Sequence, residues 1–296
     1  MNEYFIGPDR EGERLDRFLA EQMAEKSRSY LQRLIKEQEI TVNGKPVKAG
    51  YRLFSDDRIT VNLPDAKEPD IVPEDIPLDI LYEDEDLIII NKPKQMVVHP
   101  APGHYSGTLV NALMYHCGSE LSGINGTMRP GIVHRIDMDT TGSLVVCKND
   151  KSHQFLSEQL KEHSIRRIYV AIVHGNLKED TGCVRAPIGR HPTDRKRMSI
   201  HAKNGRDAAT HYKVLERFGD YTYIQCELET GRTHQIRVHM DYIGCPLLGD
   251  YLYHPDFSKI NRVALHSYAL SFSHPVTQKP MEFHMPLPKD MAGLFS

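Results

Sequence analysis

Three short segments of the chain are dense in polar residues and lie beside runs that are apolar enough to be buried strands. The first is Gly131–Gly142, where Asp137 stands between Arg135 and a Thr-Thr-Gly turn that precedes a hydrophobic run. Catalytic groups tend to lie on loops at the edge of a buried sheet. A carboxylate at such a place could act as a nucleophile or as a base.

The second segment is Thr230–His239. Strand alternation would put Arg237 on the face opposite Ile236 and Val238. From that face Arg237 could pair with a carboxylate across the site, and a close guanidinium lowers a carboxyl pKa and keeps the group ionised.

The third segment, Arg166–Tyr169, places an aromatic ring amid positive charge, which suits stacking on a base while holding phosphates. Each segment also has a plainer interpretation. Asp137 could only cap a turn, Arg237 could only close a surface salt bridge, and Tyr169 could be part of the core. Taken singly the plainer interpretations are stronger, but together the three segments form a recognisable set.

The elements that must position these segments alternate between strands and helices from about residue 76 onward. Periodicity predicts strands at 87–90, 144–147 and 169–173, helices at 108–114 and around 155–160, and a strand-rich region at 208–240. This pattern predicts an α+β fold with a central, largely antiparallel or mixed sheet.

The N-terminal part follows a different pattern. Apolar residues predict two helices around 15–19 and 31–35, followed by short strands at 40–42 and 59–61. Asn43-Gly44 between strand-like residues predicts a tight hairpin, because both turn positions favour positive φ. These elements make a compact module of two helices and a small sheet.

The net charge of −3 hides an uneven distribution. Residues 64–86 contain ten acidic residues, one lysine and the prolines Pro64, Pro69, Pro73 and Pro77, whereas basic residues outnumber acidic ones in 10–63 and in 87–296. Proline stiffens extended chain and blocks regular pairing. The stretch therefore predicts a linker that divides the protein near residue 70.

Several classes of protein are disfavoured by what the sequence lacks. The five cysteines are odd in number and contain no C-x-x-C pair, and the 16 histidines contain no H-E-x-x-H pattern. No apolar run of 18 residues and no secretory signal is present. We therefore expect no metal, no disulfide framework, no membrane partner and a cytoplasmic location.

The N-terminal module resembles an S4 RNA-binding domain over residues 12–63. The likeness is carried by Gly12–Leu19, by Ser27-Arg28-Ser29 and by Ile40–Lys45. In that family, basic residues around the two helices bind the RNA backbone, which implies RNA-binding roles for Arg14, Arg28, Arg33 and Lys36. Such phosphate contacts add affinity but little sequence choice.

The remainder, about residues 76–290, resembles the RluA family of pseudouridine synthases, in particular its branch that modifies large-subunit ribosomal RNA. The matching motifs are His134-Arg135-Ile136-Asp137, Thr140-Thr141-Gly142, Tyr169-Val170-Ala171, Asn91-Lys92-Pro93, Val97–Pro100, Gly107–Leu113 and Pro187–Pro192. Ile136, Ser143 and Gln95 depart from the usual pattern, but none of them is a catalytic position of the family.

The resemblance implies that Asp137 is the catalytic aspartate, that Tyr169 stacks on a base flipped into the pocket, and that Arg237 ion-pairs with Asp137. Arg135 and the basic loops would hold the RNA backbone. The reaction moves C1′ from N1 to C5 of uracil, so no cofactor is expected. Which atom Asp137 attacks stays open. A general-base role for His134 or His239 is disfavoured, because isomerisation has no step that requires a histidine.

The resemblances together predict an S4-like RNA-binding domain at 12–70, an acidic linker at 71–85 and a pseudouridine synthase catalytic domain at 86–296. The expected substrate is uridine in structured RNA, most consistent with 23S ribosomal RNA, and the expected assembly is a monomer. Three alternatives remain: a transfer RNA pseudouridine synthase, a non-catalytic ribosome assembly factor, and, as a distant third, an unrelated hydrolase that uses an Asp–His pair and would release a cleaved product.

Overall fold

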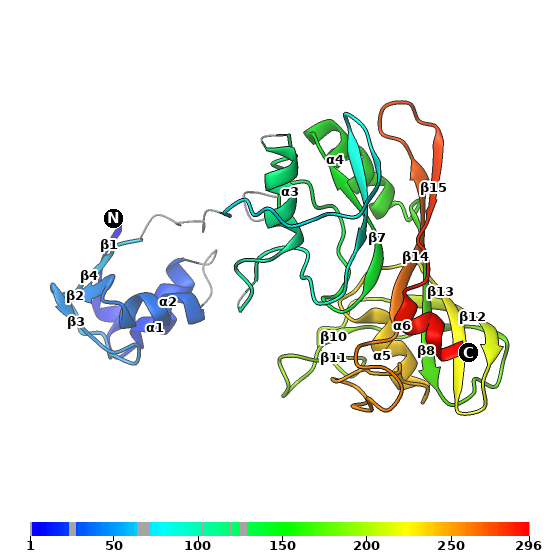
Figure 1. The fold of residues 1–296 in the computed structure, drawn as a ribbon. Helices are drawn as coiled ribbons and strands as arrows, with labels where there is room; N and C mark the ends of the chain where they lie inside the picture. Colours follow the sequence, from blue (N-terminus) through cyan, green and yellow to red (C-terminus); the bar gives the residue numbers. More distant parts are fainter. Residues whose placement is uncertain are drawn as a thin grey trace. The chain divides into compact units, whose positions relative to one another are not determined.

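The computed structural model describes residues 2–23, 28–63, 71–101, 103–118, 120–124 and 129–295. The chain divides into two compact units, Met1–Glu68 and Pro69–Ser296 (Figure 1). Each unit has a hydrophobic core of its own. Ser27 of the S4-like motif and the prolines Pro64 and Pro69 lie outside the described ranges. Within those ranges, no helix is long and apolar enough to cross a membrane.

The smaller unit packs two helices against an antiparallel sheet. The helices are α1 (Leu15–Gln22) and α2 (Arg28–Lys36), and a 3₁₀ turn η1 (Pro8–Arg10) precedes them. The sheet order is β1 (Asn2–Phe5), β4 (Arg58–Val61), β2 (Ile40–Val42) and β3 (Lys45–Pro46). Apolar side chains from both helices and from β2 and β4 share one core.

The predicted hairpin of this unit is confirmed. Asn43 and Gly44 connect β2 to β3 with φ of 51° and 71°. Positive φ at both central positions matches the twist of the flanking strands. Strand β1 was not predicted from the sequence.

The larger unit is built on a nine-stranded mixed sheet, which confirms the predicted fold class. Its order is β5 (Ile80–Glu83), β6 (Leu87–Lys92), β7 (Thr141–Cys147), β14 (Leu265–Ser273), β8 (Arg166–His174), β13 (Tyr221–Leu228), β12 (Ala209–Arg217) and β9 (Thr181–Arg185), with β15 (Pro280–His284) paired to β14. Among these pairings, only β7 with β14 is parallel. A separate two-stranded ribbon joins β10 (Gly189–Arg190) to β11 (Met198–Ser199).

Helices pack on both faces of this sheet, and its central strands are therefore buried on both sides. Helices α3 (Leu109–Cys117) and α5 (Gln235–Tyr242) share a core with Ile88 and Ile90 of β6. Helix α4 (Asp150–Lys161) packs with the alternate β6 residues Leu87 and Ile89. Helix α6 (Lys289–Ala292) and the turn η2 (Gly293–Phe295) pack near β8.

Two sequence-based predictions need correction. The segment 71–85 was predicted as a linker, but it belongs to the larger unit and contains β5, which pairs with β6. The Asn111 side chain also donates to the Val72 carbonyl at 2.8 Å. The acidic residues and prolines of this stretch hid the short strand-forming run Ile80–Tyr82.

The second correction concerns 235–239, which was predicted as a strand with Arg237 and Ile236 on opposite faces. The segment is the first part of helix α5, and all six residues from 235 to 240 are buried. A helix that is buried on every side shows no polar face, so the local apolar–polar alternation was mistaken for the period of a strand.

Candidate active site

The buried amino group of Lys92 binds the backbone of the loop that carries Asp137. The Thr140 amide donates to the Asp137 carbonyl at 3.1 Å and closes a turn. The Lys92 Nζ donates to the Met138 carbonyl at 3.0 Å and to two carbonyls of its own turn at 2.7 Å each. Burial lowers the pKa of Lys92 to about 7. The polar backbone of the Asp137 loop is thus tied to the end of β6.

The pairing of β7 with β14 requires glycine at the third position of the Thr-Thr-Gly turn. Gly142 has φ of 108°, and a Cβ at this position would lie 2.2 Å from the Ser267 carbonyl oxygen. Only glycine lets β7 approach β14 this closely and start the parallel pairing just after the Asp137 loop.

Arg237 projects from α5 and binds two carboxylates. Its Nη1 donates to Asp137 Oδ2 at 3.2 Å, while Nε and Nη2 each donate to one oxygen of Asp250 at 2.7 Å. Its side chain is 2% exposed. Burial disfavours the charge, but the hydrogen bonds and charge of Asp250, together with Asp137, raise the pKa of Arg237 above its usual value. One permanent positive charge therefore faces two acids.

Asp250 was missed by the sequence analysis. Its side chain is fully buried, and its Oδ1 also accepts hydrogen bonds from the Leu252 and Tyr253 amides at 3.1 and 3.2 Å. These bonds and the two from Arg237 satisfy the carboxylate, so it orients the guanidinium toward Asp137. A Gly-Asp pair in a turn carries no sequence signal for this role.

His234 also lies at the site, although the sequence analysis did not single it out. Its Nε2 is 3.9 Å from Asp137 Oδ2, and its Nδ1 is 3.0 Å from the Tyr253 hydroxyl. It is the N-cap residue that precedes α5, and it has a left-handed conformation with φ of 55°. Burial lowers the pKa of His234, which favours a neutral ring at neutral pH.

A cavity of about 510 Å³ brings the three expected catalytic residues together: Asp137, Tyr169 and Arg237 all line it. This volume falls within the usual range for ligand pockets. The Asp137 side chain is 21% exposed, so it can reach a ligand in the cavity. Tyr169 projects from β8, and burial raises the pKa of its phenol, which stays neutral. The arrangement combines an acid, its guanidinium partner and a ring suited to stacking.

The two histidines considered as general bases have structural contacts instead. His134 Nε2 accepts from the Val145 amide at 3.1 Å, and burial lowers its pKa to about 3. His239 is fully buried, with its ring nitrogens 2.9 Å from the Thr210 hydroxyl and 3.0 Å from the Ala186 carbonyl. Arg135 lines the cavity as well, and its Nη1 lies 3.5 Å from His99 Nε2.

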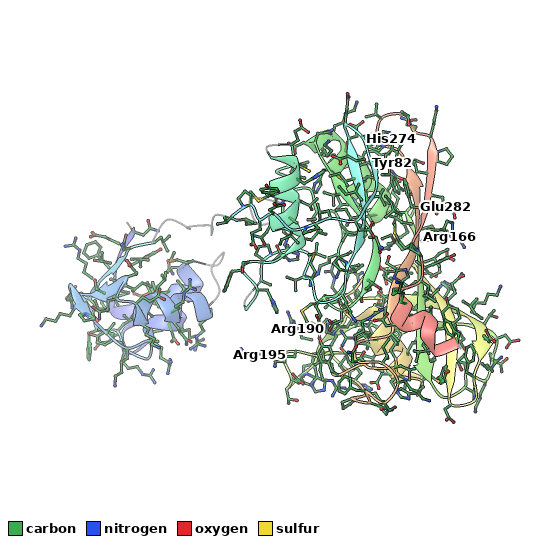
Figure 2. All side chains as sticks on the ribbon, in the orientation of Figure 1. Tyr82, Arg166, Arg190, Arg195, His274 and Glu282 are labelled. Atoms are coloured by element: carbon green, nitrogen blue, oxygen red, sulfur yellow. The ribbon has the colours of Figure 1, made fainter. Side chains whose placement is uncertain are left out.

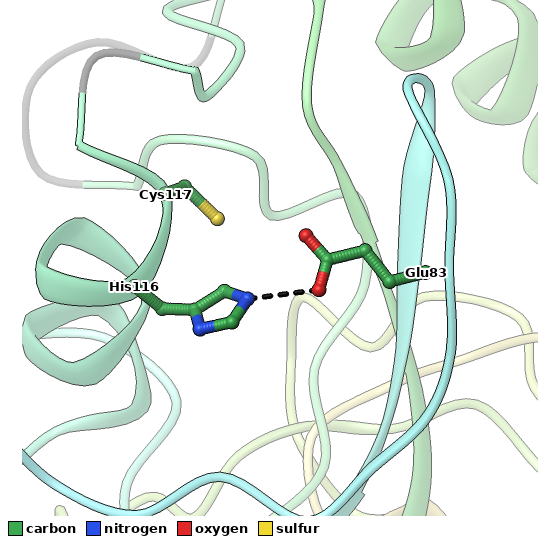
Figure 3. Close-up of side chains that lie close together, drawn as sticks. All are labelled: Glu83, His116 and Cys117. Carbon is green, nitrogen blue, oxygen red and sulfur yellow. Dashed lines mark hydrogen bonds and ion pairs between the residues drawn. The ribbon is translucent and has the colours of Figure 1, made fainter.

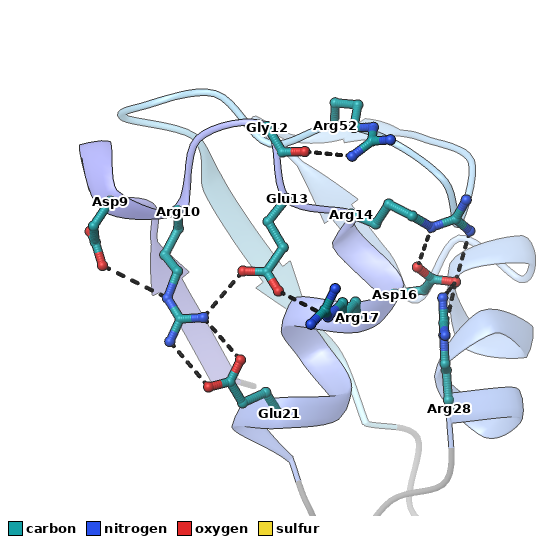
Figure 4. Close-up of polar contacts among 10 residues, drawn as sticks. All are labelled: Asp9, Arg10, Gly12, Glu13, Arg14, Asp16, Arg17, Glu21, Arg28 and Arg52. Atoms are coloured by element: carbon teal, nitrogen blue, oxygen red, sulfur yellow. Dashed lines mark hydrogen bonds and ion pairs between the residues drawn. The ribbon is translucent and has the colours of Figure 1, made fainter.

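Some of the basic residues expected to bind RNA in the smaller unit are already ion-paired with acidic side chains of the same unit (Figure 4). Arg14 and Arg28 both bind the buried carboxylate of Asp16, at 3.0 Å each, and their side chains are 44% and 51% exposed. Arg33 Nε lies 3.8 Å from Glu37. Lys36 lies in the last turn of α2.

Several groups of side chains have the composition of a metal site, among them Glu83, His116 and Cys117 (Figure 3). Glu83 is already bonded to His116 at 2.8 Å and to the Lys148 ammonium at 3.1 Å. Burial raises the pKa of Cys117 to about 11, which disfavours the thiolate that a metal requires. The group is better explained as an ion-paired cluster.

Comparisons with known proteins agree with this geometry. The family model described as RNA pseudouridylate synthase matches residues 86–242, and the S4 domain model matches residues 13–59. The chain is 51% identical over 290 residues to the RNA pseudouridine synthase YlyB of Bacillus subtilis, which covers 97% of this chain and 94% of the relative. It is 42% identical over 298 residues to ribosomal large subunit pseudouridine synthase D of Escherichia coli K12, covering 96% and 90% of the two chains.

A solved structure shares the fold. Human RNA pseudouridylate synthase domain containing 1 aligns with a TM-score of 0.58 at 24% identity, over 71% of this chain and 83% of the human one.

Proposed function

The chain belongs to the RNA pseudouridylate synthase family and is an RNA pseudouridine synthase with an S4 domain, and we propose that it uses Asp137 to isomerise uridine in large-subunit ribosomal RNA. The observation that carries the catalytic assignment is the hydrogen bond from Arg237 to Asp137 at the wall of a cavity that Tyr169 also lines. The ribosomal substrate is supported by the relatives named for large-subunit ribosomal RNA, which match over nearly the full chain.

The reaction sets clear demands on the pocket. The C1′–N1 bond breaks, the uracil turns, C1′ joins C5, the C5 proton leaves, and N1 gains a proton. The target base must leave its stack to enter the cavity, and the Tyr169 ring offers a surface for it. Asp137 supplies the negative charge, as nucleophile or base, and Arg237 holds it in place.

Arg135 and the S4 residues Arg14, Arg28, Arg33 and Lys36 are proposed to bind the RNA backbone. Arg135 lines the cavity, and the other four lie just before or within the two helices of the smaller unit. Phosphate contacts of this kind position the RNA without reading its sequence.

Replacing Asp137 tests the catalytic assignment. The Asp137→Asn variant should bind RNA with nearly the affinity of the wild type, yet release no measurable tritium from RNA that contains 5-tritiated uridine. Amide for carboxylate keeps the shape but removes the charge. Wild-type tritium release by this variant would contradict the assignment.

A complementation experiment tests the substrate. Pseudouridines are mapped in cells that lack the gene and in cells that carry the wild type or Asp137→Asn. We expect the missing sites to lie in large-subunit ribosomal RNA and to return only with the wild type. Sites in transfer RNA would favour the first alternative substrate, and normal ribosomes restored by Asp137→Asn would favour an assembly role.

A further inference from the structure

Arg167 is a second arginine of the cavity wall that the proposed mechanism does not use. It stands two residues before Tyr169 on β8, so both side chains point to the same face of the sheet. Arg167 is 8% exposed and lines the same cavity as Asp137. Two residues along a strand separate the two side chains by about 7 Å, roughly the length of a nucleotide from base to phosphate.

The guanidinium of Arg167 has no protein partner among the described residues. Its Nε is buried and makes no hydrogen bond, and no carboxylate in the described part of the chain pairs with it. A buried charge without a partner is costly, and such groups are normally paired. The neighbouring Arg166 is a direct contrast, because it lies outside the cavity and binds both Glu227 oxygens at 2.8 and 3.0 Å.

The surroundings of Arg167 leave room for an anion. A Cβ at Gly231 would lie 2.7 Å from Arg167 Nη1, so the glycine makes space for the guanidinium. Lys161 and Arg232 line the cavity too, and among its described lining residues Asp137 is the single acid. Arg166, by contrast, lies near Glu282, because both residues pair with Ser271 of β14, one from β8 and the other from β15 (Figure 2).

We propose that Arg167 binds a phosphate of the RNA backbone next to the uridine that stacks on Tyr169, an inference that rests on the proposed function. Phosphates are the formal anions of RNA, and the planar guanidinium fork matches their geometry. The phosphate is the missing partner of the buried charge. Arg167 would thereby fix the nucleotide at its backbone while Asp137 acts on the uridine.

The experiment compares Arg167→Gln with Arg166→Gln in the full chain. The probe is 5-tritiated total RNA from cells that lack the gene, which contains the substrate whichever RNA class it belongs to. Arg167→Gln should raise KM roughly 10-fold or more, the effect of losing one hydrogen-bonded charge. It should also lower the slope of log KM against log salt by about 0.7, the value for one phosphate of a single strand. Arg166→Gln should match the wild type, because Arg166 lies outside the cavity and is paired with Glu227; of the two arginines in the Arg166–Tyr169 segment, only Arg167 is placed to hold a phosphate.

Thermal unfolding separates binding from a structural role. Removing an unpaired buried charge should leave the Tm of Arg167→Gln unchanged or raised, whereas a structural arginine would lower it. Gly231→Ala is the second variant, because it keeps the charge but displaces the flexible guanidinium end, and it should also raise KM. Arg167→Lys should recover part of the loss.

Two outcomes would overturn the assignment: an unchanged salt slope in Arg167→Gln, or a fall in kcat and Tm with KM unchanged. The proposed substrate fails separately. If wild-type tritium release came from the transfer RNA fraction, the ribosomal assignment would be wrong, while the KM and salt slopes would still decide the role of Arg167.

Discussion

The two units each contain a cluster of arginine and carboxylate groups around a buried side chain, but the ratio of charges is reversed. In the smaller unit one carboxylate, Asp16, binds two arginines, Arg14 and Arg28, and also accepts from Gln32 at 2.6 Å. In the larger unit one arginine, Arg237, binds two carboxylates. The first cluster has an excess positive charge and the second an excess negative charge.

The difference matches the role proposed above for each unit, RNA binding by the smaller unit and catalysis by the larger. The two arginines on Asp16 are about half exposed, so their outer edges can contact RNA phosphates. The hydrogen bonds from Arg14, working against burial and assisted by Gln32 and Arg28, hold the pKa of Asp16 well below its usual range. At Arg237 the buried Asp250 binds the guanidinium through two bonds, and Asp137 receives only one. The other oxygen of Asp137 is therefore not bonded to Arg237, as the proposed catalytic role requires.

Breaking the Arg237–Asp250 pair should give the largest effect. Asp250→Asn removes one partner of a buried ion pair, which should reduce the free energy of unfolding of the larger unit by about 3 kcal/mol. The released guanidinium can then turn fully onto Asp137, and kcat should fall by about 100-fold through misplacement of the carboxylate. Denaturant unfolding and tritium release measure the two effects.

Asp241→Asn is the matched control, because Asp241 lies in the same helix α5, whereas the carboxylates that Arg237 binds in the described structure are Asp137 and Asp250. It should change kcat little. If Asp250→Asn kept wild-type kcat, Asp250 would not orient the guanidinium, and the reversed charge ratio would have no catalytic meaning.

Breaking the cluster at Asp16 should give a smaller effect that is confined to the other unit. Asp16→Asn should destabilise the smaller unit by about 1–3 kcal/mol, because the charged hydrogen bonds of Asp16 are lost. The loss is smaller than at Asp250 because the half-exposed arginines regain water. Amide hydrogen exchange in the full chain measures this locally. Asp9→Asn, at an exposed acid, is the control.

The effect of Asp16 also has a defined pH dependence. The pKa of Asp16 is lower in the folded state than in the unfolded chain, so its stabilising contribution is full above the unfolded value of about 4. It is lost as the pH falls through the folded value. The difference between wild type and Asp16→Asn should therefore be constant from pH 7 to 5 and shrink below pH 4. A difference that shrank already between pH 7 and 5 would contradict the assignment.

The sequence could predict the parts of the two units that depend on local pattern. The Asn43-Gly44 hairpin follows from the φ preference of two residues, and the buried strands around Tyr169 follow from apolar runs. The pairing of Arg237 with Asp137 was expected only through family resemblance, since 100 residues separate the two.

What the sequence could not predict depends on tertiary packing. Asp250 has no local mark that separates it from an ordinary turn residue, and only the folded α5 brings Arg237 to it. The unpaired state of Arg167 cannot be distinguished from the paired state of Arg166 by composition, although strand alternation does place the two on opposite faces.

The smallest expected effect tests whether the positive excess of the smaller unit serves binding alone. Arg28→Gln should weaken RNA binding a few-fold and lower the salt slope by about 0.7, because one phosphate contact is lost. It should leave the single-turnover rate at saturating RNA unchanged, since Asp137, Tyr169 and Arg237 all belong to the larger unit. Asp250→Asn should do the reverse and change the rate more than the salt slope. If Arg28→Gln slowed the saturated rate as well, the two units would not divide binding from chemistry, and the charge ratio of each cluster would have to be explained by stability instead.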